Sequence, residues 1–483
     1  MFDTPQTMEQ LRLVAGRLLE YLQSADDRSC SVVDYRSPQD IEALFESMGL
    51  PLLPGQAQPA RLYEAVSQVL ELAVRTEHPR FFNQSFAGAD PVSVVADWLV
   101  TTINTTAATY EMSPLPTLME RSIVRAFAKK VGFTTCDGIM GPGGSLSNLM
   151  ALQLARHHKK PSARQAGDFT RWAVFISAQA HYSMKKSVVL MGLGEDALIP
   201  VPCDAAGQMM PDALERALGN TDREPLAIVG TAGTTVLGAF DPLAALAKVA
   251  QSHDVWFHVD GCHGASVLFS DRYRHLMDGA EQADSLAWNP HKMSGVAQQC
   301  SLLLVKHPTL LQDTFATGAS YLFQKDKLFT EYDSGDKTIL CGRRADALKL
   351  WLTWLVRGDE GFGMRIDHVF GLASHLSNRL ESDPRFQIVA PPSFTHTCFW
   401  WVPPALRPLD LATLSDQERL GLHGIAPKIK RQMQAEGSTM MSYQPLGDLP
   451  NFFRWLFINP ATTTEDIDAL IETIDRYGMQ SLD

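Results

Sequence analysis

Four groups of residues able to do chemistry follow one another between positions 141 and 292 of this 483-residue chain. The first is a glycine-rich segment, GPGGSLSN, that begins at Gly141. His181 follows, Asp260 closes the apolar run VWFHVD, and Lys292 stands in NPHKM, directly after the run SLAWN. Each group alone is a weak signal, so the chemistry depends on whether the fold brings the four together.

The glycine-rich segment and Lys292 each have two readings. A helix-like run follows the glycines, and a helix start offers free N–H groups to a phosphate that the glycine backbone lets come close. A plain glycine-rich turn fits the same residues. A lysine at the end of a strand can form a Schiff base with an aldehyde cofactor, whereas a solvated surface lysine needs no ligand.

Asp260 and His181 are also ambiguous. The carboxylate of Asp260 leaves an apolar strand and is costly to bury unless it is paired. A protonated pyridine nitrogen is one such partner, and a helix cap or a structural salt bridge is another. The flat imidazole of His181 suits stacking on a cofactor ring, although a lone histidine also serves in a core or on a surface.

The elements around these groups predict how they are positioned. Short apolar runs at 172–177, 226–231, 255–260, 285–289 and 301–306 alternate with helix-like stretches, including one between the third and fourth runs. This alternation predicts a mainly parallel sheet. Thr231, Asp260 and Asn289 end three of the runs and should meet at one rim, where open α/β sheets bind ligands.

The rest of the chain predicts flanking helical and mixed segments. Residues 5–25 and a second segment from Leu62 to Val74 show helical spacing, separated by a Pro/Gly-bearing stretch at 51–60. A long helix is expected within 344–380, shorter strands within 384–459, and a final helix from Thr464 to Tyr477. The predicted domains are an N-terminal helical arm (1–100), a large domain (101–375) and a small C-terminal α+β domain (376–483).

Composition narrows the class of protein. With 45% hydrophobic and 20% charged residues, the chain is globular, and its net charge of −12 gives no general attraction to nucleic acid or to an anionic membrane. The seven cysteines form no CxxC or Cys/His metal pattern, so we expect neither a disulfide scaffold nor a metal site. No signal peptide and no membrane span are read, and a cytoplasmic protein is expected.

The order of the four groups is typical of the large domain of fold-type-I pyridoxal phosphate (PLP) enzymes, and longer stretches make the resemblance specific. The chain resembles the group II PLP-dependent amino acid decarboxylases of the glutamate, aspartate and cysteine sulfinate type, and is most similar to the cysteine sulfinate type. The matching stretches include HPRFFNQ (78–84), NTTAATYEMSP (104–114), DGIMGPGGSLSNLM (137–150), HVDGCHGA (258–265), WNPHKM (288–293), SYLFQKDK (320–327) and NFFRW (451–455). The resemblance implies an α/β fold with a PLP-dependent transferase-like large domain.

The resemblance also implies a role for each site residue. Lys292 would bind the cofactor covalently, Asp260 would pair with its ring nitrogen, and His181 would stack on its ring. Gly144, Ser145, Thr231 and His291 complete the expected cofactor-binding set. Arg454 would hold the substrate α-carboxylate and set the angle of the bond that breaks, and Gln84 and Phe86 would contact the rest of the substrate.

The chain departs from the family pattern at several positions. Gly261 and His263 stand where relatives commonly have alanine, which packs on the ring, and tryptophan. Phe329 aligns with a tyrosine of a mobile loop thought to protonate the product carbanion, which leaves Tyr332 as the candidate phenol. Thr106 and Ala108 replace residues that look like Asn and Phe in glutamate decarboxylase, so the pocket shape is not predicted cleanly.

The expected reaction is decarboxylation of a small acidic amino acid: cysteine sulfinate, aspartate or cysteate first, with glutamate also open. Alternatives are a larger or basic substrate such as 2,4-diaminobutyrate, another fold-type-I enzyme such as an aminotransferase, and a catalytically silent regulatory homologue. The resemblance implies a homodimer with the active site at the interface and the N-terminal arms exchanged.

Overall fold

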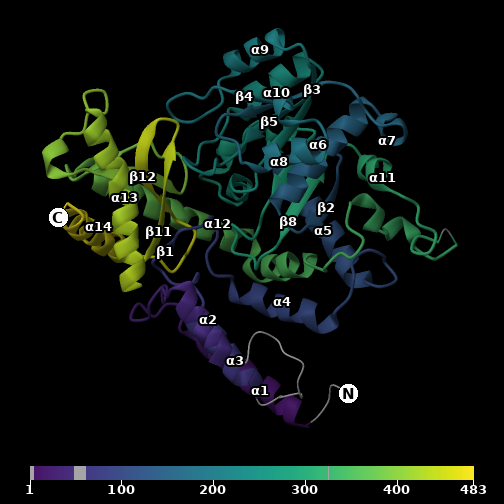
Figure 1. Ribbon diagram of the computed structural model, residues 1–483. Coiled ribbons are helices and arrows are strands. Elements are labelled where there is room, and N and C mark those ends of the chain that lie inside the picture. Colours follow the sequence, from purple (N-terminus) through teal and green to yellow (C-terminus); the bar gives the residue numbers. More distant parts are fainter. Residues whose placement is uncertain (1–4, 48–60, 325, 483) are drawn as a thin grey trace. The chain divides into compact units, whose positions relative to one another are not determined.

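The computed structural model describes residues 5–47, 61–324 and 326–482 (Figure 1). The predicted linker at 51–60 lies outside these residues. The chain divides into a larger unit, Ala89–Ser374 with Ala390–Cys398, and a smaller unit, Met1–Gly88 with His375–Val389 and Phe399–Asp483. The three-domain division with boundaries at 100 and 375 stays a prediction beside this grouping.

A seven-stranded sheet forms the centre of the larger unit, in the order β2-β8-β7-β6-β5-β3-β4. Its strands are β2 (Asp137–Gly141), β3 (Trp172–Ser177), β4 (Leu198–Val201), β5 (Glu224–Thr231), β6 (Trp256–Asp260), β7 (Ser285–Trp288) and β8 (Ser301–Val305). The neighbours from β7 to β4 pair in parallel, whereas β8 runs antiparallel to both β2 and β7. The mainly parallel sheet is therefore confirmed, with one reversed strand.

The connections explain both the parallel pairs and the exception. Helix α10 (Leu243–Ser252) joins β5 to β6 and lets β6 return in the same direction. Between β6 and β7 the structure has only short 3-10 turns, beginning with Gly264–Phe269, so the helix predicted there is wrong. No helix separates β7 from β8, and β8 accordingly comes back antiparallel.

Helices cover the sheet and pack on its buried side chains. The helices of the larger unit are α4 (Pro91–Ile103), α5 (Pro114–Val131), α6 (Gly144–Lys159), α7 (Ala163–Ala166), α8 (Ser183–Leu190), α9 (Pro211–Asn220), α10, α11 (Leu310–Phe315) and most of α12 (Ala347–Glu381). Met150 and Leu154 of α6 and Met184 of α8 share one core cluster with strand residues such as Val174. Figure 1 shows α6 and α8 side by side against the strands.

The smaller unit contains most of a five-stranded sheet of order β1-β11-β12-β10-β9 and the remaining helices. Its elements are α1 (Pro5–Gln23), α2 (Pro38–Ser47), α3 (Arg61–Leu72), β1 (Phe81–Phe82), β9 (Phe386–Ile388), β10 (His396–Trp401), α13 (Asp416–Glu436), β11 (Met440–Leu446), β12 (Leu449–Leu456) and α14 (Thr464–Gln480). The predicted helices at 5–25, 62–74 and 464–477 correspond to α1, α3 and α14. Helix α2 was not predicted.

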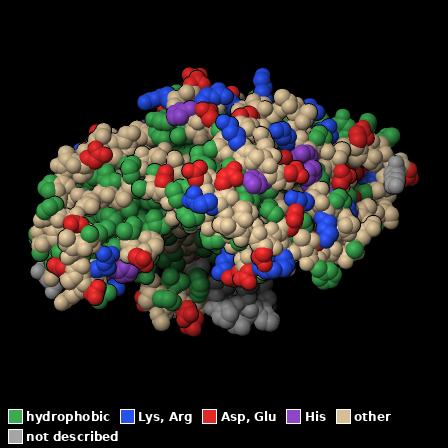
Figure 2. Space-filling view, turned by 90° about the horizontal axis from the view of Figure 1, so that it is seen from above, with side chains coloured by type: hydrophobic (Ala, Val, Ile, Leu, Met, Phe, Trp, Pro, Cys, Tyr) green, Lys and Arg blue, Asp and Glu red, His purple; other side chains and the backbone are tan. Residues whose placement is uncertain are grey.

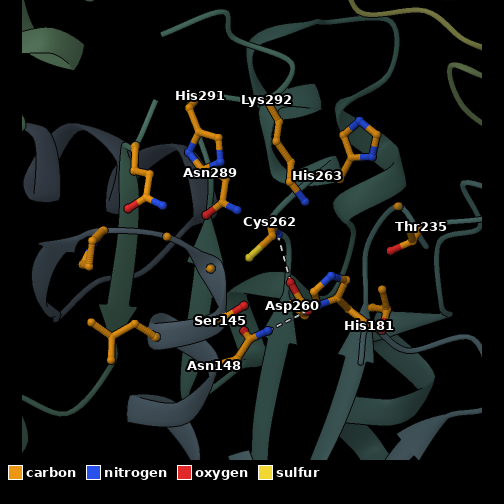
Figure 3. A pocket seen from close by; sticks show the side chains of 17 residues that line it. Ser145, Asn148, His181, Thr235, Asp260, Cys262, His263, Asn289, His291 and Lys292 are labelled. Atoms are coloured by element: carbon orange, nitrogen blue, oxygen red, sulfur yellow. Dashed lines mark hydrogen bonds between the residues drawn. The ribbon is translucent and has the colours of Figure 1, made fainter. Parts of the chain in front are cut away.

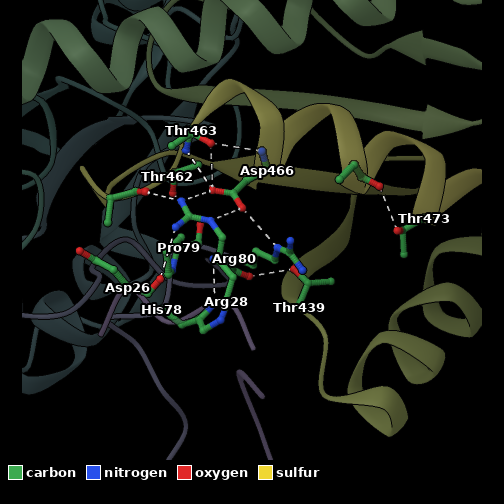
Figure 4. A network of polar contacts seen from close by, with 12 residues as sticks. Asp26, Arg28, His78, Pro79, Arg80, Thr439, Thr462, Thr463, Asp466 and Thr473 are labelled. Atoms are coloured by element: carbon green, nitrogen blue, oxygen red, sulfur yellow. Dashed lines mark hydrogen bonds and ion pairs between the residues drawn. The ribbon is translucent and has the colours of Figure 1, made fainter. Parts of the chain in front are cut away.

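One carboxylate connects distant parts of the smaller unit. Asp466 caps the start of α14, where it forms a capping box with Thr463. It also pairs with Arg28 at 2.7 Å and with Arg80 at 3.3 Å (Figure 4). These hydrogen bonds outweigh the effect of burial and lower the pKa of Asp466. The segment before β1 is thereby fixed beside α14.

The long predicted helix is present as α12, with a break inside it. Gly358 has φ 64° and ψ −179°, which interrupts the helical backbone. A positive φ costs a glycine little, so the chain turns here without the strain another residue would bear. Across the face shown in Figure 2, basic and acidic side chains are interspersed.

Candidate active site

The ends of the central strands carry the predicted site residues to one place. His181 follows β3, Thr231 ends β5, Asp260 ends β6, and Lys292 follows β7. Because β3, β5, β6 and β7 are parallel, their carboxyl ends lie along one edge of the sheet. Thr231 and Asp260 are direct partners in the register of β5 and β6.

A cavity of about 380 Å³ opens at this edge (Figure 3). All seven residues predicted to bind the cofactor line it: Gly144, Ser145, His181, Thr231, Asp260, His291 and Lys292. In Figure 3 the side chain of Lys292 reaches across the cavity toward Asp260 and Cys262. The structure therefore brings together residues that are far apart in the sequence.

The glycine-rich segment forms the turn from β2 into α6, as a phosphate-binding loop requires. Gly143 has φ 140°, and α6 begins at Gly144 with no side chain capping its N–H groups. A Cβ on Gly144 would lie 2.8 Å from Asn289 Nδ2, so only glycine fits at this close approach. The exposed start of α6 therefore presents N–H groups and the positive end of a helix dipole to the cavity.

Asp260 is buried and held as an anion. Burial by itself would raise the pKa of Asp260, but a hydrogen bond with the Cys262 side chain and the nearby His258, Lys292 and His181 lower it below its ordinary value. The Cys262 N–H also donates to Oδ1 at 3.2 Å. A carboxylate that stays charged at this depth suits pairing with a cation. A protonated ring nitrogen is such a cation.

His181 is a neutral ring at the cavity wall. Burial lowers its pKa. Its Nδ1 accepts the N–H of Ser183 at 3.2 Å, so its single ring proton is on Nε2. A neutral imidazole that lines the cavity suits stacking on an aromatic ring.

The segment that carries Lys292 is held from both sides. His291 Nδ1 lies 2.5 Å from the carbonyl oxygen of Cys300 and 3.2 Å from the backbone nitrogen of the same residue. Trp288, at the end of β7, stacks on Phe127 with ring centroids 3.9 Å apart and donates to Ser266 at 2.9 Å. The backbone that presents Lys292 is therefore rigid before any ligand binds.

Two buried polar groups in the cavity test whether a cofactor fits. Thr231 Oγ1 and the Asn289 side-chain oxygen are buried, and neither makes a hydrogen bond within the described residues. Both residues line the cavity. Buried polar groups are normally paired, so these two atoms point to a polar ligand. Together with the helix start, an anionic Asp260 and a lysine, they fit pyridoxal phosphate.

The predicted substrate-binding residues lie in the smaller unit. Arg454, on β12, is buried and donates to Ser442 Oγ at 3.0 Å and to the carbonyl of Asn83 at 3.2 Å. Gln84 directly follows Asn83 and is exposed. The half-buried Phe86 lies with its ring centroid 6.3 Å from that of Phe81. Arg454 thus forms a hydrogen bond with the residue that directly precedes Gln84 in the sequence.

Tyr332 is placed differently from the cofactor-binding set. It lines a separate cavity with Arg121 and Lys337. Its ring lies 5.2 Å from that of Tyr110 and 4.4 Å beneath the Arg121 guanidinium. Phe329 also packs on Tyr110, at 5.7 Å. The predicted role of Tyr332 in catalysis stays a prediction.

The segment after Asp260 contributes two side chains to the cavity wall. The cavity is lined by Cys262 and His263 and not by Gly261. A Cβ on Gly261 would lie 2.8 Å from that of Ala265, so the glycine serves packing. His263 is buried, edge-on to Phe394 at 4.8 Å. The lining residues Asn148, Thr235 and Asn289 were not assigned to the site from sequence; of these, only Asn289 had a signal, at the end of a run.

Comparisons with known proteins show the family of the chain. The model of the pyridoxal-dependent decarboxylase conserved domain matches residues 52–402. Human cysteine sulfinic acid decarboxylase is 41% identical over 476 residues, which cover 97% of this chain and 95% of that protein. The crystal structure of mouse CSAD superposes with a TM-score of 0.93 at 37% identity and covers 99% of both chains.

More distant structures share the fold. Oryza sativa TDC, solved with PLP and tryptamine, has a TM-score of 0.88 at 22% identity and covers 100% of this chain and 99% of its own. The family match spans the glycine loop, the lysine and the whole central sheet. From the family match and the cavity together, the chain belongs to the pyridoxal-dependent decarboxylase family and is a PLP-dependent amino acid carboxy-lyase.

Proposed function

We propose that the protein decarboxylates a small acidic L-amino acid, with cysteine sulfinate as the preferred substrate and aspartate and cysteate as lesser ones. The observation that carries this proposal is the 41% identity to human cysteine sulfinic acid decarboxylase over nearly the full length of both chains. Phe86 also matches that type rather than the glutamate type, where a small serine is usual.

In this proposal each cavity residue has one task. Lys292 holds the cofactor covalently, and the N–H groups at Gly144 and Ser145 bind its phosphate. Asp260 keeps the ring nitrogen protonated, His181 covers one ring face, and Thr231 and His291 line the remaining walls. When bound, pyridoxal phosphate supplies an electron sink for the pair left behind by the departing CO₂.

The substrate is held by groups of the smaller unit. Arg454 binds the α-carboxylate, because a guanidinium grips a carboxylate with two parallel hydrogen bonds and fixes its angle. Ser442 and Asn83 support that guanidinium, as their hydrogen bonds to it indicate. Gln84 and Phe86 contact the remainder of the substrate.

We also propose a homodimer in the cytoplasm. Helices α1 and α3 have no buried residues and carry exposed apolar side chains such as Leu11 and Val69. In the larger unit, α4 and α5 expose further ones, including Trp98 and Leu115. A second copy of the chain would cover such surfaces. The described residues include all seven cysteines, none in a disulfide.

Among the described helices, none has the length and hydrophobicity needed to cross a membrane.

Release of CO₂ from a panel of amino acids tests the proposed function. Cysteine sulfinate, cysteate, aspartate, glutamate and 2,4-diaminobutyrate are compared by kcat/KM, with Lys292→Ala as the inactive control. We expect cysteine sulfinate to give the highest value. A higher value for glutamate or 2,4-diaminobutyrate contradicts the proposed substrate, and no CO₂ from any of them with cofactor bound contradicts the reaction.

A further inference from the structure

A chain of buried hydrogen bonds runs from the core of the larger unit to Asp260. Trp256 Nε1 donates to Ser285 Oγ at 3.0 Å, and Ser285 Oγ lies 2.8 Å from His258 Nδ1. His258 Nε2 lies 3.1 Å from Asn148 Oδ1, and Asn148 Nδ2 donates to Asp260 Oδ2 at 2.9 Å. Figure 3 shows this last hydrogen bond.

The donor and acceptor groups available fix the direction of each hydrogen bond in this series. The Asp260 carboxylate only accepts, so the Asn148 amide must turn its nitrogen toward it and its oxygen toward His258. His258 therefore carries its proton on Nε2 and accepts the Ser285 hydroxyl at Nδ1. Burial lowers the pKa of His258 to about 4, which keeps the ring neutral. The second Asn148 N–H donates to Ser183 Oγ at 3.1 Å.

Both carboxylate oxygens of Asp260 accept a hydrogen bond. Its Oδ2 accepts from Asn148, and its Oδ1 accepts from the Cys262 N–H. Asn148 and His258 are 1% and 0% exposed, so water cannot replace either donor. The other titratable groups near Asp260 are Lys292, His181 and the Cys262 thiol.

We propose that His258 and Asn148 are positioning residues that hold the Asp260 carboxylate oriented and anionic, and so set how firmly the cofactor ring nitrogen keeps its proton. Neither residue needs to touch substrate or cofactor for this effect. If the donor to Oδ2 is lost, Asp260 becomes more basic and competes for the ring proton. The ring then attracts the electron pair left by CO₂ less strongly, and the cofactor is held less tightly.

Two substitutions at His258 separate this role from packing. Glutamine places an amide nitrogen near the position of Nε2 and can still donate to Asn148. Asparagine reaches only the position of Nδ1 and cannot. We expect His258→Asn to raise the cofactor dissociation constant about tenfold and to lower kcat similarly, with KM little changed. His258→Gln should stay within about threefold of the unsubstituted enzyme for both quantities.

Substitution of Asn148 tests the same relay nearer the carboxylate. Asn148→Leu keeps the volume and removes both donors. We expect weaker binding of the cofactor, as in His258→Asn. We also expect a shift in the pH at which the absorbance band of the bound cofactor changes. Circular dichroism and melting curves check that each variant is folded. Equal behaviour of the two His258 variants, or an unshifted titration in Asn148→Leu, overturns the proposal.

A measurement on the histidine rings themselves tests the relay without reference to activity. Nuclear magnetic resonance of the cofactor-free protein, with ¹⁵N only in histidine, reports the tautomer of each ring. We expect one buried ring, lost in His258→Gln where that variant folds, to stay neutral with its proton on Nε2 between about pH 6 and 8. His181 is expected to have the same tautomer, so the signal lost in His258→Gln or His258→Asn identifies the His258 ring. If that ring carries its proton on Nδ1, or is charged over that range, the relay is wrong.

Discussion

A buried ion pair between Glu120 and Arg343 supports the region around the glycine loop. Glu120 Oε1 and Arg343 Nη2 lie 2.5 Å apart, with 6% and 3% of their side chains exposed. Arg343 also donates to the carbonyl oxygens of Ala107 at 2.8 Å and Met140 at 3.1 Å. Glu120 accepts the N–H of Met140 at 2.6 Å. Met140 lies in β2, just before the loop, so the pair holds the strand that presents it.

Removal of Glu120 should destabilise the larger unit strongly. In Glu120→Ala the guanidinium charge of Arg343 stays buried without its acidic partner, which costs about 3–5 kcal/mol. For a domain of this size, 1 kcal/mol shifts the melting temperature by about 2–4 °C. We therefore expect Glu120→Ala to melt about 6–20 °C below the unsubstituted protein.

Scanning calorimetry measures this shift, with Glu331→Ala as the matched control. Glu331 is exposed and in the same unit, so its loss removes the same charge and should change the melting temperature by less than about 2 °C. The double variant Glu120→Ala with Arg343→Met should recover part of the loss, because no buried charge then remains at this pair. A Glu120→Ala protein that melts within about 2 °C of the control refutes this reasoning.

Three further outcomes are expected. Arg454→Met should raise KM for the amino acid about tenfold or more while the cofactor stays bound; unchanged KM removes Arg454 from the substrate site. Tyr332→Phe should lower kcat about tenfold or more and speed self-inactivation, which progress curves measure. An unchanged progress curve shows that the Tyr332 phenol does not protonate the product carbanion. Burial raises the pKa of Asp241 to about 6 from 3.8, so the stability it contributes is full below about pH 4 and lost as pH rises through about 6. The free energy of unfolding of the unsubstituted protein, relative to that of Asp241→Asn, should therefore fall by about 3 kcal/mol over that pH range, as measured by melting at several pH values. A difference between the two proteins that stays constant with pH contradicts this.

The residues with strong local patterns were predicted well. The apolar runs that became β3 and β5 to β8 have lengths and side chains typical of buried strands, and the predicted cofactor set lines one cavity. The carboxyl ends of parallel strands lie at one edge of a sheet, so polar residues that end such strands lie close together. The sheet and the gathering of these residues at one cavity were therefore accessible from sequence.

Features set by tertiary contacts were not predicted. A helix was predicted between β6 and β7, where the structure has short 3-10 turns, and β8 returns antiparallel after a connection from β7 that contains no helix. Asn148 lies inside α6 and reads as an ordinary helix residue, and His258 reads as one polar residue in an apolar strand. Their hydrogen bonds join side chains 110 residues apart, and no local pattern encodes such a pair.

The attachment of the cofactor to Lys292 is the claim on which the rest depends, and one measurement tests it. Borohydride reduction of the PLP-loaded enzyme makes the bond between cofactor and lysine permanent, and peptide mass spectrometry then locates it. We predict the phosphopyridoxyl group on the peptide that contains His291 and Lys292, and on no other. Attachment to a different lysine, or none at all in an enzyme that still releases CO₂, would contradict the site described for this protein.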